Sequence, residues 1–191
     1  MNKIKLVVIV GPTAIGKTST SIELAKELNG EIVSADSMQI YRYMDIGTAK
    51  PNMSERQGIP HYMMDIIEPD ESFNVAIYQK RAKAAIDCIY KKGKLPFLVG
   101  GSGLYVNSIV YPLDFTTATE DHELRAELYK KVEEKGNYYL HQKLAEIDPT
   151  TAKRVHPNDV KRIVRAMEIY CLTGKPMSQH KQNLKNADIP Y

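Results

Sequence analysis

Hydrophobic residues in the first hundred positions gather in short continuous runs rather than alternating with polar ones. Such runs occupy residues 4–10, 31–35 and 95–99, and each leads directly into a glycine or a polar turn. Continuous apolar runs of this length are typical of strands that are buried on both faces of a parallel sheet. A mixed run at 61–67 predicts a further strand.

Two stretches between these runs carry apolar residues at helical spacing. Residues 19–28 end at an Asn-Gly pair, and Asn74 is placed to cap a second helix that runs to about Lys92. The stretch 41–60 holds two glycines and two prolines, and we predict an irregular segment there with one short helix. Alternating strands and helices predict an α/β fold with a parallel sheet that is flanked by helices.

The pattern changes after about residue 116. Four charged segments with helical spacing follow, at 120–135, 138–146, 150–155 and 160–172, without any strand pattern between them. We therefore predict three parts, which are an α/β core over 1–115, an all-α insertion over 116–180 and the start of a return to the core over 181–191.

Composition adds limits to this picture. A content of 43% hydrophobic and 26% charged residues is ordinary for a soluble globular protein. No apolar run approaches the roughly 20 residues of a membrane span, so we expect no membrane partner. Cys88 and Cys171 lack metal-ligand spacing, which favours free thiols in a reducing cytoplasm. The chain enters a strand almost at once, and we expect no cleaved signal peptide.

The net charge of +3 is unevenly distributed. Residues 151–191 hold eight Lys or Arg against three acidic residues, whereas residues 120–150 hold five against eight. A basic C-terminal segment suggests a polyanionic partner such as a nucleic acid. Charge alone, however, favours an ordinary solvated helix face.

The first candidate for chemistry is a glycine-rich turn between the first strand and the first helix. Its pattern is G-x-x-x-x-G-K-T, formed by Gly11, Pro12, Thr13, Ala14, Ile15, Gly16, Lys17 and Thr18. In this context the pattern predicts a phosphate-binding P-loop, and the alternative is an ordinary strand-to-helix turn. Backbone N–H groups and the helix N-terminus would surround an anion, and Lys17 would reach its terminal phosphates. The Thr18 hydroxyl is placed to coordinate Mg²⁺. The fold is therefore predicted to be P-loop NTPase-like.

Two further turns follow the other buried strands. Asp36 comes at the end of the second strand, at the sheet edge where parallel-sheet proteins bind their ligands. Its carboxylate could hold Mg²⁺ through water or accept a proton, and the alternative is a turn or cap aspartate. Gly100-Gly101-Ser102-Gly103 is a second glycine-rich turn, which could offer N–H groups and the Ser102 hydroxyl to a ligand. The alternative is a tight turn that binds no ligand. No carboxylate ends that third strand, which argues against a motor-type ATPase.

Five sequence blocks together resemble the tRNA dimethylallyltransferase family, also called tRNA isopentenyltransferases. The P-loop would be unspecific alone, but the ordered combination of all five blocks is specific. The other four are Asp36-Ser37-Met38-Gln39-Ile40-Tyr41-Arg42, Asp45-Ile46-Gly47-Thr48-Ala49-Lys50-Pro51, Gly100-Gly101-Ser102-Gly103-Leu104-Tyr105 and the run from His156 to Glu168.

The resemblance implies an enzyme that transfers a dimethylallyl group from dimethylallyl diphosphate to the exocyclic N6 amine of the adenine 3′ of certain tRNA anticodons, releasing pyrophosphate. The P-loop would hold the diphosphate rather than act in an ATPase, and whether ATP also binds there stays open. Asp36 would be the general base, with Lys17 and Thr13 as the other catalytic residues, and Mg²⁺ would be the cofactor. We expect a cytoplasmic monomer that binds the anticodon stem-loop of tRNA.

The resemblance also assigns RNA-contacting positions to both parts of the chain. The helical insertion would grip the tRNA. The residues concerned are Asp36, Ser37, Met38, Gln39, Ser102, Arg125, Val160, Lys161, Arg162, Ile163, Val164 and Arg165.

Two departures from the family and two competing functions accompany this interpretation. The family commonly has Thr where Ser102 stands, and its members usually continue well beyond the position of Tyr191, so we expect part of a longer protein. One alternative is a small-molecule kinase similar to nucleoside-monophosphate or shikimate kinases, which would need lid arginines. The stretch 41–60 offers only Arg42 and Arg56. The other alternative is a non-catalytic RNA-binding fragment.

Overall fold

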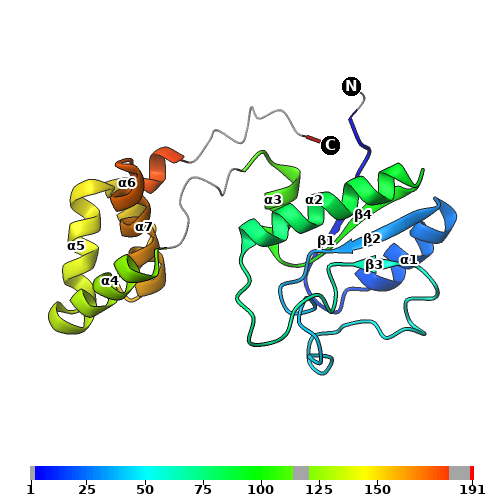
Figure 1. Ribbon diagram of the computed structural model, residues 1–191, viewed down its shortest axis with the longest axis horizontal. Coiled ribbons are helices and arrows are strands. Elements are labelled where there is room, and N and C mark those ends of the chain that lie inside the picture. Colours follow the sequence, from blue (N-terminus) through cyan, green and yellow to red (C-terminus); the bar gives the residue numbers. More distant parts are fainter. Residues whose placement is uncertain (1–2, 114–120, 181–189) are drawn as a thin grey trace. The chain divides into compact units, whose positions relative to one another are not determined.

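The computed structural model describes residues 3–113, 121–180 and 190–191 (Figure 1). These residues fall into two compact units. Residues 3–113 together with 190–191 form an α/β unit, and residues 121–180 form a helical unit. The prediction for residues 181–189 lies outside the described residues.

A four-stranded parallel sheet forms the centre of the α/β unit. Its strands are β1 (Val7–Val10), β2 (Gly30–Ser34), β3 (His61–Tyr62) and β4 (Leu95–Gly100), and their order is β1-β4-β2-β3. The central pairing aligns Ile32 with Phe97 and Val33 with Leu98. The predicted strands at 31–35 and 95–99 are present and buried on both faces of the sheet. The strand predicted at 4–10 is shorter, over Val7–Val10, and one of its faces is exposed at Val8 and Val10.

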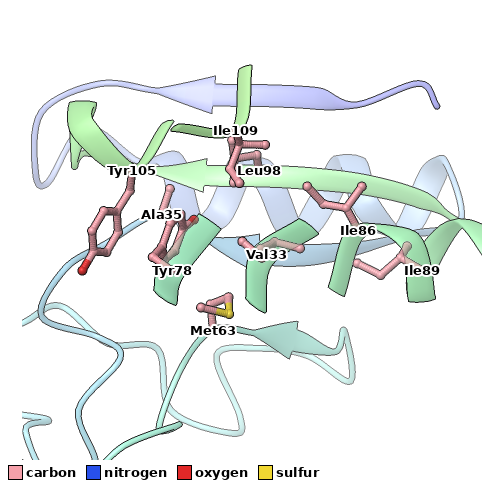
Figure 2. Packing of buried hydrophobic residues seen from close by; sticks show 10 residues of the cluster. Val33, Ala35, Met63, Tyr78, Ile86, Ile89, Leu98, Tyr105 and Ile109 are labelled. Carbon is pink, nitrogen blue, oxygen red and sulfur yellow. The ribbon is translucent and has the colours of Figure 1, made fainter. Parts of the chain in front are cut away.

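Neighbouring residues of each strand serve opposite faces of the sheet. Ile32 and Phe97 pack with α1 (Lys17–Glu27), whereas Val33 and Leu98 pack with α2 (Val75–Lys91) and α3 (Gly103–Val110). Figure 2 shows the second cluster, in which the rings of Tyr78 and Tyr105 stack with their centroids 3.9 Å apart. The sheet is therefore covered by helices on both sides, as the sequence predicted (Figure 1).

Helix α2 begins where its capping residue predicts. The Oδ1 atom of Asn74 accepts a hydrogen bond from the backbone N–H of Ile77 at 3.0 Å, which satisfies one of the free N–H groups of the first turn. Tyr191, near the other end of the chain, packs against the cluster beneath this helix.

The segment between β2 and α2 differs from the prediction in two places. Residues 41–60, all of which the structure describes, form turns and contain no helix. The strand predicted at 61–67 ends after Tyr62, because Met63 and Asp65 adopt left-handed backbone conformations with φ of 63° and 54°. An extended strand cannot continue through such residues.

The helical unit is built around one hydrophobic cluster. Leu128, Leu144, Ile163 and Val164 are among its buried members. Each of three helices begins at an aspartate whose side chain accepts a hydrogen bond from its first turn. The elements are α4 (His122–Lys135), α5 (Asn137–Ile147), α6 (Pro149–Ala152), α7 (Val160–Thr173) and the 3₁₀ helix η1 (Met177–His180). They agree with the four predicted helices to within a few residues.

A buried carboxylate stabilises the end of the sheet that lies away from the P-loop. Glu31, on β2, is 2% exposed. It accepts hydrogen bonds from Lys94 Nζ at 2.7 Å, Tyr62 Oη at 2.7 Å and Lys92 Nζ at 3.0 Å. Burial alone would raise the pKa of Glu31, but the three hydrogen bonds outweigh it and lower the pKa to about 2.

We expect this carboxylate to make stability dependent on pH. A depressed pKa stabilises the folded state fully above pH 4.5, and the stabilisation is lost as the pH falls towards about 2. The loss would amount to at most about 3 kcal/mol. Urea unfolding of the wild type and of Glu31→Gln between pH 6 and pH 2 measures it. Parallel pH profiles for the two proteins would contradict the assignment.

Candidate functional site

The P-loop connects the end of β1 to the start of α1. Its turn uses left-handed conformations at Ala14, with φ of 68°, and at Gly16, with φ of 86°. Gly16 immediately precedes the helix, and no side chain caps the first turn of α1. The free N–H groups of that turn therefore remain available to an anion, and the positive end of the helix dipole favours it.

Lys17 is the cation of this loop. Its ammonium donates a hydrogen bond to the carbonyl oxygen of Pro12 at 2.6 Å, so the side chain folds back over the loop. A phosphate bound at the N-terminus of α1 would lie near the Lys17 ammonium. The geometry fits a lysine that exchanges a backbone carbonyl for a phosphate oxygen.

A cavity of about 510 Å³ opens beside the P-loop. Three groups of residues form much of its lining, namely the P-loop with the start of α1, the turn after β2, and the segment 48–51. Its lining includes Thr13, Ala14, Lys17, Thr18, Asp36 and Gln39 of the predicted site residues. The structure therefore brings the predicted phosphate-binding and proton-accepting groups into one cavity, at the carboxyl ends of the strands.

Asp36 follows β2 and is half-buried. Its Oδ1 atom accepts hydrogen bonds from the backbone N–H groups of Met38 at 2.8 Å and Gln39 at 3.4 Å. This is the turn role that the sequence left as an alternative. The turn hydrogen bonds use only Oδ1. They do not exclude a role as proton acceptor, because the Asp36 carboxylate also lines the cavity.

Ser102 holds the second glycine-rich turn against the turn of Asp36. Its backbone N–H donates to the carbonyl of Ala35 at 3.1 Å, and its hydroxyl oxygen accepts from the N–H of Ser37 at 2.9 Å. The two turns approach so closely that a Cβ atom on Gly100 would overlap the Ala35 carbonyl, so only glycine fits there. The Ser102 hydroxyl thus supports the position of Asp36.

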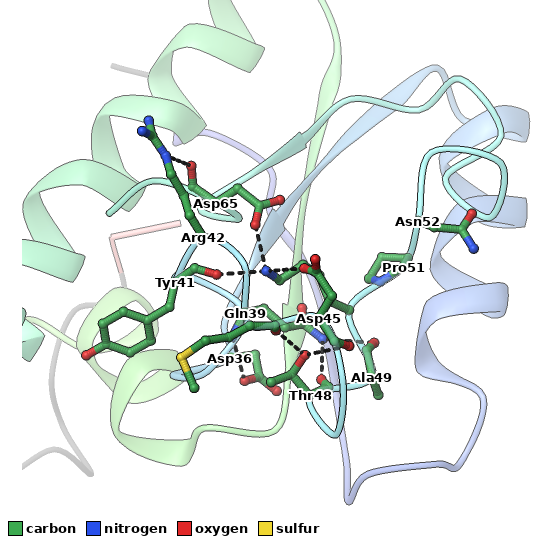
Figure 3. A network of polar contacts seen from close by, with 12 residues as sticks. Asp36, Gln39, Tyr41, Arg42, Asp45, Thr48, Ala49, Pro51, Asn52 and Asp65 are labelled. Atoms are coloured by element: carbon green, nitrogen blue, oxygen red, sulfur yellow. Dashed lines mark hydrogen bonds and ion pairs between the residues drawn. The ribbon is translucent and has the colours of Figure 1, made fainter. Parts of the chain in front are cut away.

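The segment 48–51 forms one wall of the cavity. Hydrogen bonds of Gln39 and Lys50 hold this wall, and Figure 3 shows those of Gln39 to Thr48 and Ala49. The Gln39 amide donates to the carbonyls of Thr48 and Ala49, both at 3.2 Å, and its oxygen accepts from the Ser34 hydroxyl. Both amide hydrogens of Gln39 are therefore already used. The contact with RNA that the family resemblance implies for Gln39 would have to come from its side-chain oxygen.

Arg42 and Arg56, the two arginines of the stretch 41–60, bind other groups of the protein. Arg42 donates to the carbonyl of Asp65 and to the Glu68 carboxylate, and Arg56 donates to the carbonyl of Pro51 and to the Asp65 carboxylate. Neither guanidinium lines the cavity. They do not form the arginine lid that a small-molecule kinase would need.

In the helical unit, the predicted RNA-contacting residues divide into two groups. Ile163 and Val164 are 0% and 1% exposed within the hydrophobic cluster, so their side chains face the core and are not available to RNA in this structure. Helix periodicity puts them on the buried face of α7. Lys161 and Arg162 are exposed on the same helix, and Arg162 forms an ion pair with Asp159 at 3.2 Å.

Arg125 and Arg165 share one buried carboxylate. Glu168 is 0% exposed and accepts from Arg125 Nε at 2.9 Å, from Arg125 Nη2 at 3.0 Å and from Arg165. Burial would raise the pKa of Glu168, but these hydrogen bonds outweigh it and lower the pKa. Arg125 thus connects α4 to α7, and Arg165 binds the same carboxylate from within α7. These are structural roles that the sequence did not predict.

The sequence interpretation also missed three features of the cavity itself. Lys50 and His61 line it, and Thr48 with Ala49 completes the wall. The block from Asp45 to Pro51 carried the family resemblance but received no role. The place of this block among those that carry the family resemblance was the signal that could have identified the wall.

Two searches of the described residues found nothing. Residues 3–113, 121–180 and 190–191 contain no group of three or more His, Cys, Asp or Glu side chains that could hold a metal ion. Within the same ranges, every helix is too short or too polar to cross a membrane.

Comparison with curated proteins gives relatives with one name. A protein of Alkaliphilus oremlandii named tRNA dimethylallyltransferase is 56% identical over 182 residues, which are 95% of this chain and 58% of that protein. One of Thermoanaerobacter sp., with the same name, is 54% identical over 94% of this chain and 57% of its own length. The chain therefore spans somewhat under three fifths of the length of these relatives.

Solved structures and a family model agree with these relatives. The full-length tRNA isopentenylpyrophosphate transferase of Bacillus halodurans matches with a TM-score of 0.61 and 52% identity, over 91% of this chain and 57% of that one. A eukaryotic dimethylallyltransferase described as acting on tRNA matches with a TM-score of 0.81 and 33% identity, over 95% of this chain and 45% of that one. The model of the IPP transferase family matches residues 39–191. The P-loop, the Asp36 turn and the wall of the cavity therefore lie in a chain that belongs to the IPP transferase family.

Proposed function

We propose that the protein transfers a dimethylallyl group from dimethylallyl diphosphate to the N6 amine of the adenine 3′ of the anticodon in tRNA. The observation that carries the proposal is the meeting of the P-loop and Asp36 in one cavity, in a chain of this family. In the reaction, the adenine nitrogen forms a bond to the allylic carbon. The bond from that carbon to the diphosphate oxygen breaks, and pyrophosphate leaves with the electron pair.

The P-loop would stabilise the leaving group. Negative charge grows on the diphosphate as the carbon–oxygen bond breaks, and the N–H groups of the first turn of α1 face that charge without rearranging. Lys17 would add its ammonium after leaving the Pro12 carbonyl. A single donor of this kind contributes about 3–4 kcal/mol to the lowering of the barrier.

Asp36 would act on the acceptor. The exocyclic amine of adenine is a poor nucleophile, because its lone pair is delocalised into the ring. The Asp36 carboxylate can take a proton from this amine while the new bond forms, and its Oδ1 hydrogen bonds to the turn hold it in place. General base catalysis of this type is worth roughly 10²–10⁴-fold in rate.

Mg²⁺ fits the polar groups beside the P-loop as a cofactor. Thr18 lies in the first turn of α1, lines the cavity and could offer one hydroxyl ligand. Mg²⁺ typically keeps several waters and binds through one or two protein ligands together with substrate phosphates. Bound there, it would neutralise charge on the leaving pyrophosphate.

The RNA would be held mainly by its phosphates and by the extruded base. Lys161 and Arg162, which are exposed on α7, are suited to phosphate contacts. The target adenine must leave the stacked anticodon loop, which costs at most a few kcal/mol in an already single-stranded loop. We also propose that the protein is a monomer and that it acts in the cytoplasm.

One incubation tests this function against the alternatives. We expect the protein, mixed with Mg²⁺, labelled dimethylallyl diphosphate and unmodified tRNA, to transfer label into tRNA, and to transfer no phosphoryl group from ATP to a small acceptor. Phosphoryl transfer would support the kinase instead. Binding of tRNA without either reaction would support a non-catalytic RNA-binding protein and overturn the proposal.

A further inference from the structure

The cavity wall at 48–51 belongs to a segment that has no helix or strand of its own. Residues 44–54, all described, form turns and bends, so backbone ladders do not fix their position. Ala49 even adopts a left-handed conformation, with φ of 49°. Something other than secondary structure must therefore hold the wall at its distance from the P-loop.

Lys50 supplies that support through contacts with three different points of the chain. Its ammonium donates to the carbonyl of Tyr41 at 2.7 Å, to Asp45 Oδ1 at 2.8 Å and to Asp65 Oδ1 at 2.6 Å (Figure 3). The side chain is 3% exposed. One buried group thus connects Tyr41, which precedes the segment, Asp45 near its start and Asp65 after β3.

The same contacts exclude a direct role in phosphate binding. A lysine ammonium has three hydrogen-bond donors, and here each is used by an oxygen atom of the protein. A lysine that lines a cavity beside a P-loop would otherwise be a natural phosphate ligand. Lys17 donates to one carbonyl oxygen among the described residues, whereas Lys50 has no N–H left for a diphosphate.

Electrostatics also favours a permanent structural contact. A buried ammonium is costly unless it is paired and hydrogen-bonded, and Lys50 faces the carboxylates of Asp45 and Asp65. Burial alone would lower the pKa of Lys50, but the hydrogen bonds to these carboxylates outweigh it and raise the pKa. The ammonium therefore stays charged in the neutral pH range.

We infer that Lys50 is a positioning residue, which holds the wall at 48–51 against the P-loop and Asp36 through its three hydrogen bonds. This inference rests on the proposed function and assigns a role inside that same site. Reactions between two bound partners depend steeply on their separation and orientation, so a displaced wall would lower the rate more than it weakens binding of the diphosphate.

The matched variants are Lys50→Met and Lys94→Met. Both remove an ammonium that pairs with a carboxylate in the α/β unit, but Lys94 pairs with Glu31, away from the cavity. For Lys50→Met we expect at least tenfold faster amide hydrogen exchange in residues 44–50 and at least a tenfold fall in kcat for prenyl transfer. The dissociation constant for inorganic pyrophosphate should change less than twofold. Lys94→Met should leave both the exchange in this segment and kcat within twofold of wild type.

A milder variant covers the case in which Lys50→Met does not fold. Asp45→Ala removes one of the three acceptors, and its side chain is 68% exposed, so the change leaves the core intact. It should accelerate exchange in the same segment. Unchanged exchange in Asp45→Ala, or an equal loss of kcat in Lys94→Met, would overturn the inference. Absence of prenyl transfer in the wild type would instead overturn the proposed function. Amide hydrogen exchange and pyrophosphate binding would still test the positioning role of Lys50.

Discussion

Replacing Asp36 with asparagine is expected to lower the rate of prenyl transfer by roughly 10²–10⁴-fold. Asparagine keeps an oxygen that can accept the hydrogen bonds from Met38 and Gln39, so the turn after β2 should persist. It cannot take a proton from the adenine amine at neutral pH. Single-turnover transfer of labelled prenyl group into tRNA measures the rate, and binding of dimethylallyl diphosphate should change little.

Asp36→Ala separates the two roles of this side chain. Alanine removes the proton acceptor and the turn acceptor together, so its rate should be at least as low as that of the asparagine variant. Full activity in Asp36→Asn with loss of activity in Asp36→Ala would make Asp36 a turn residue alone.

The second large effect is expected in the helical unit, on stability. Glu168→Ala should lower the free energy of unfolding by about 3 kcal/mol or more, because it removes the buried carboxylate shared by Arg125 and Arg165. The backbone N–H of Asp121 loses its acceptor as well, since it donates to Glu168 Oε1 at 2.9 Å. Urea unfolding, followed by the circular dichroism of the helices, measures the change.

Glu146→Ala is the matched control for this change. Glu146 pairs with Lys143 at 2.9 Å on the surface of α5, where its side chain is 61% exposed. Exposed pairs contribute about 0–1 kcal/mol, so the control should unfold close to wild type. Equal effects of the two variants would show that the ion pairs around Glu168 add little to stability.

The sheet and the P-loop were predictable because their signals are local. Continuous apolar runs mark strands buried on both faces, and the spacing from Gly11 to Thr18 itself encodes the turn and the helix start. The cap at Asn74 is equally local. The end of β3 was not predictable in this way, because no local pattern marks the left-handed conformations at Met63 and Asp65. Asp65 is bound by Arg42 and Lys50 from distant positions in the chain.

The roles of charged residues were harder to predict, because a sequence shows a charge and not its partner. Arg125 and Arg165 look like residues for binding RNA until Glu168 is found between them. Lys50 likewise depends on Asp65, which is fifteen positions away in the chain. Only the folded chain distinguishes these pairs from free surface charges such as Lys161.

The alternation of faces along β2 also determines the direction in which the chain leaves the strand towards Asp36. Ile32 faces α1 and lines the cavity, while Val33 belongs to the opposite cluster. Asp36 lies four positions after Ile32, so it has the same parity and reaches the same cavity. An insertion or deletion of one residue in β2 would exchange the two faces and turn Asp36 away from the P-loop. The geometry of the proposed site thus depends on the number of residues in β2.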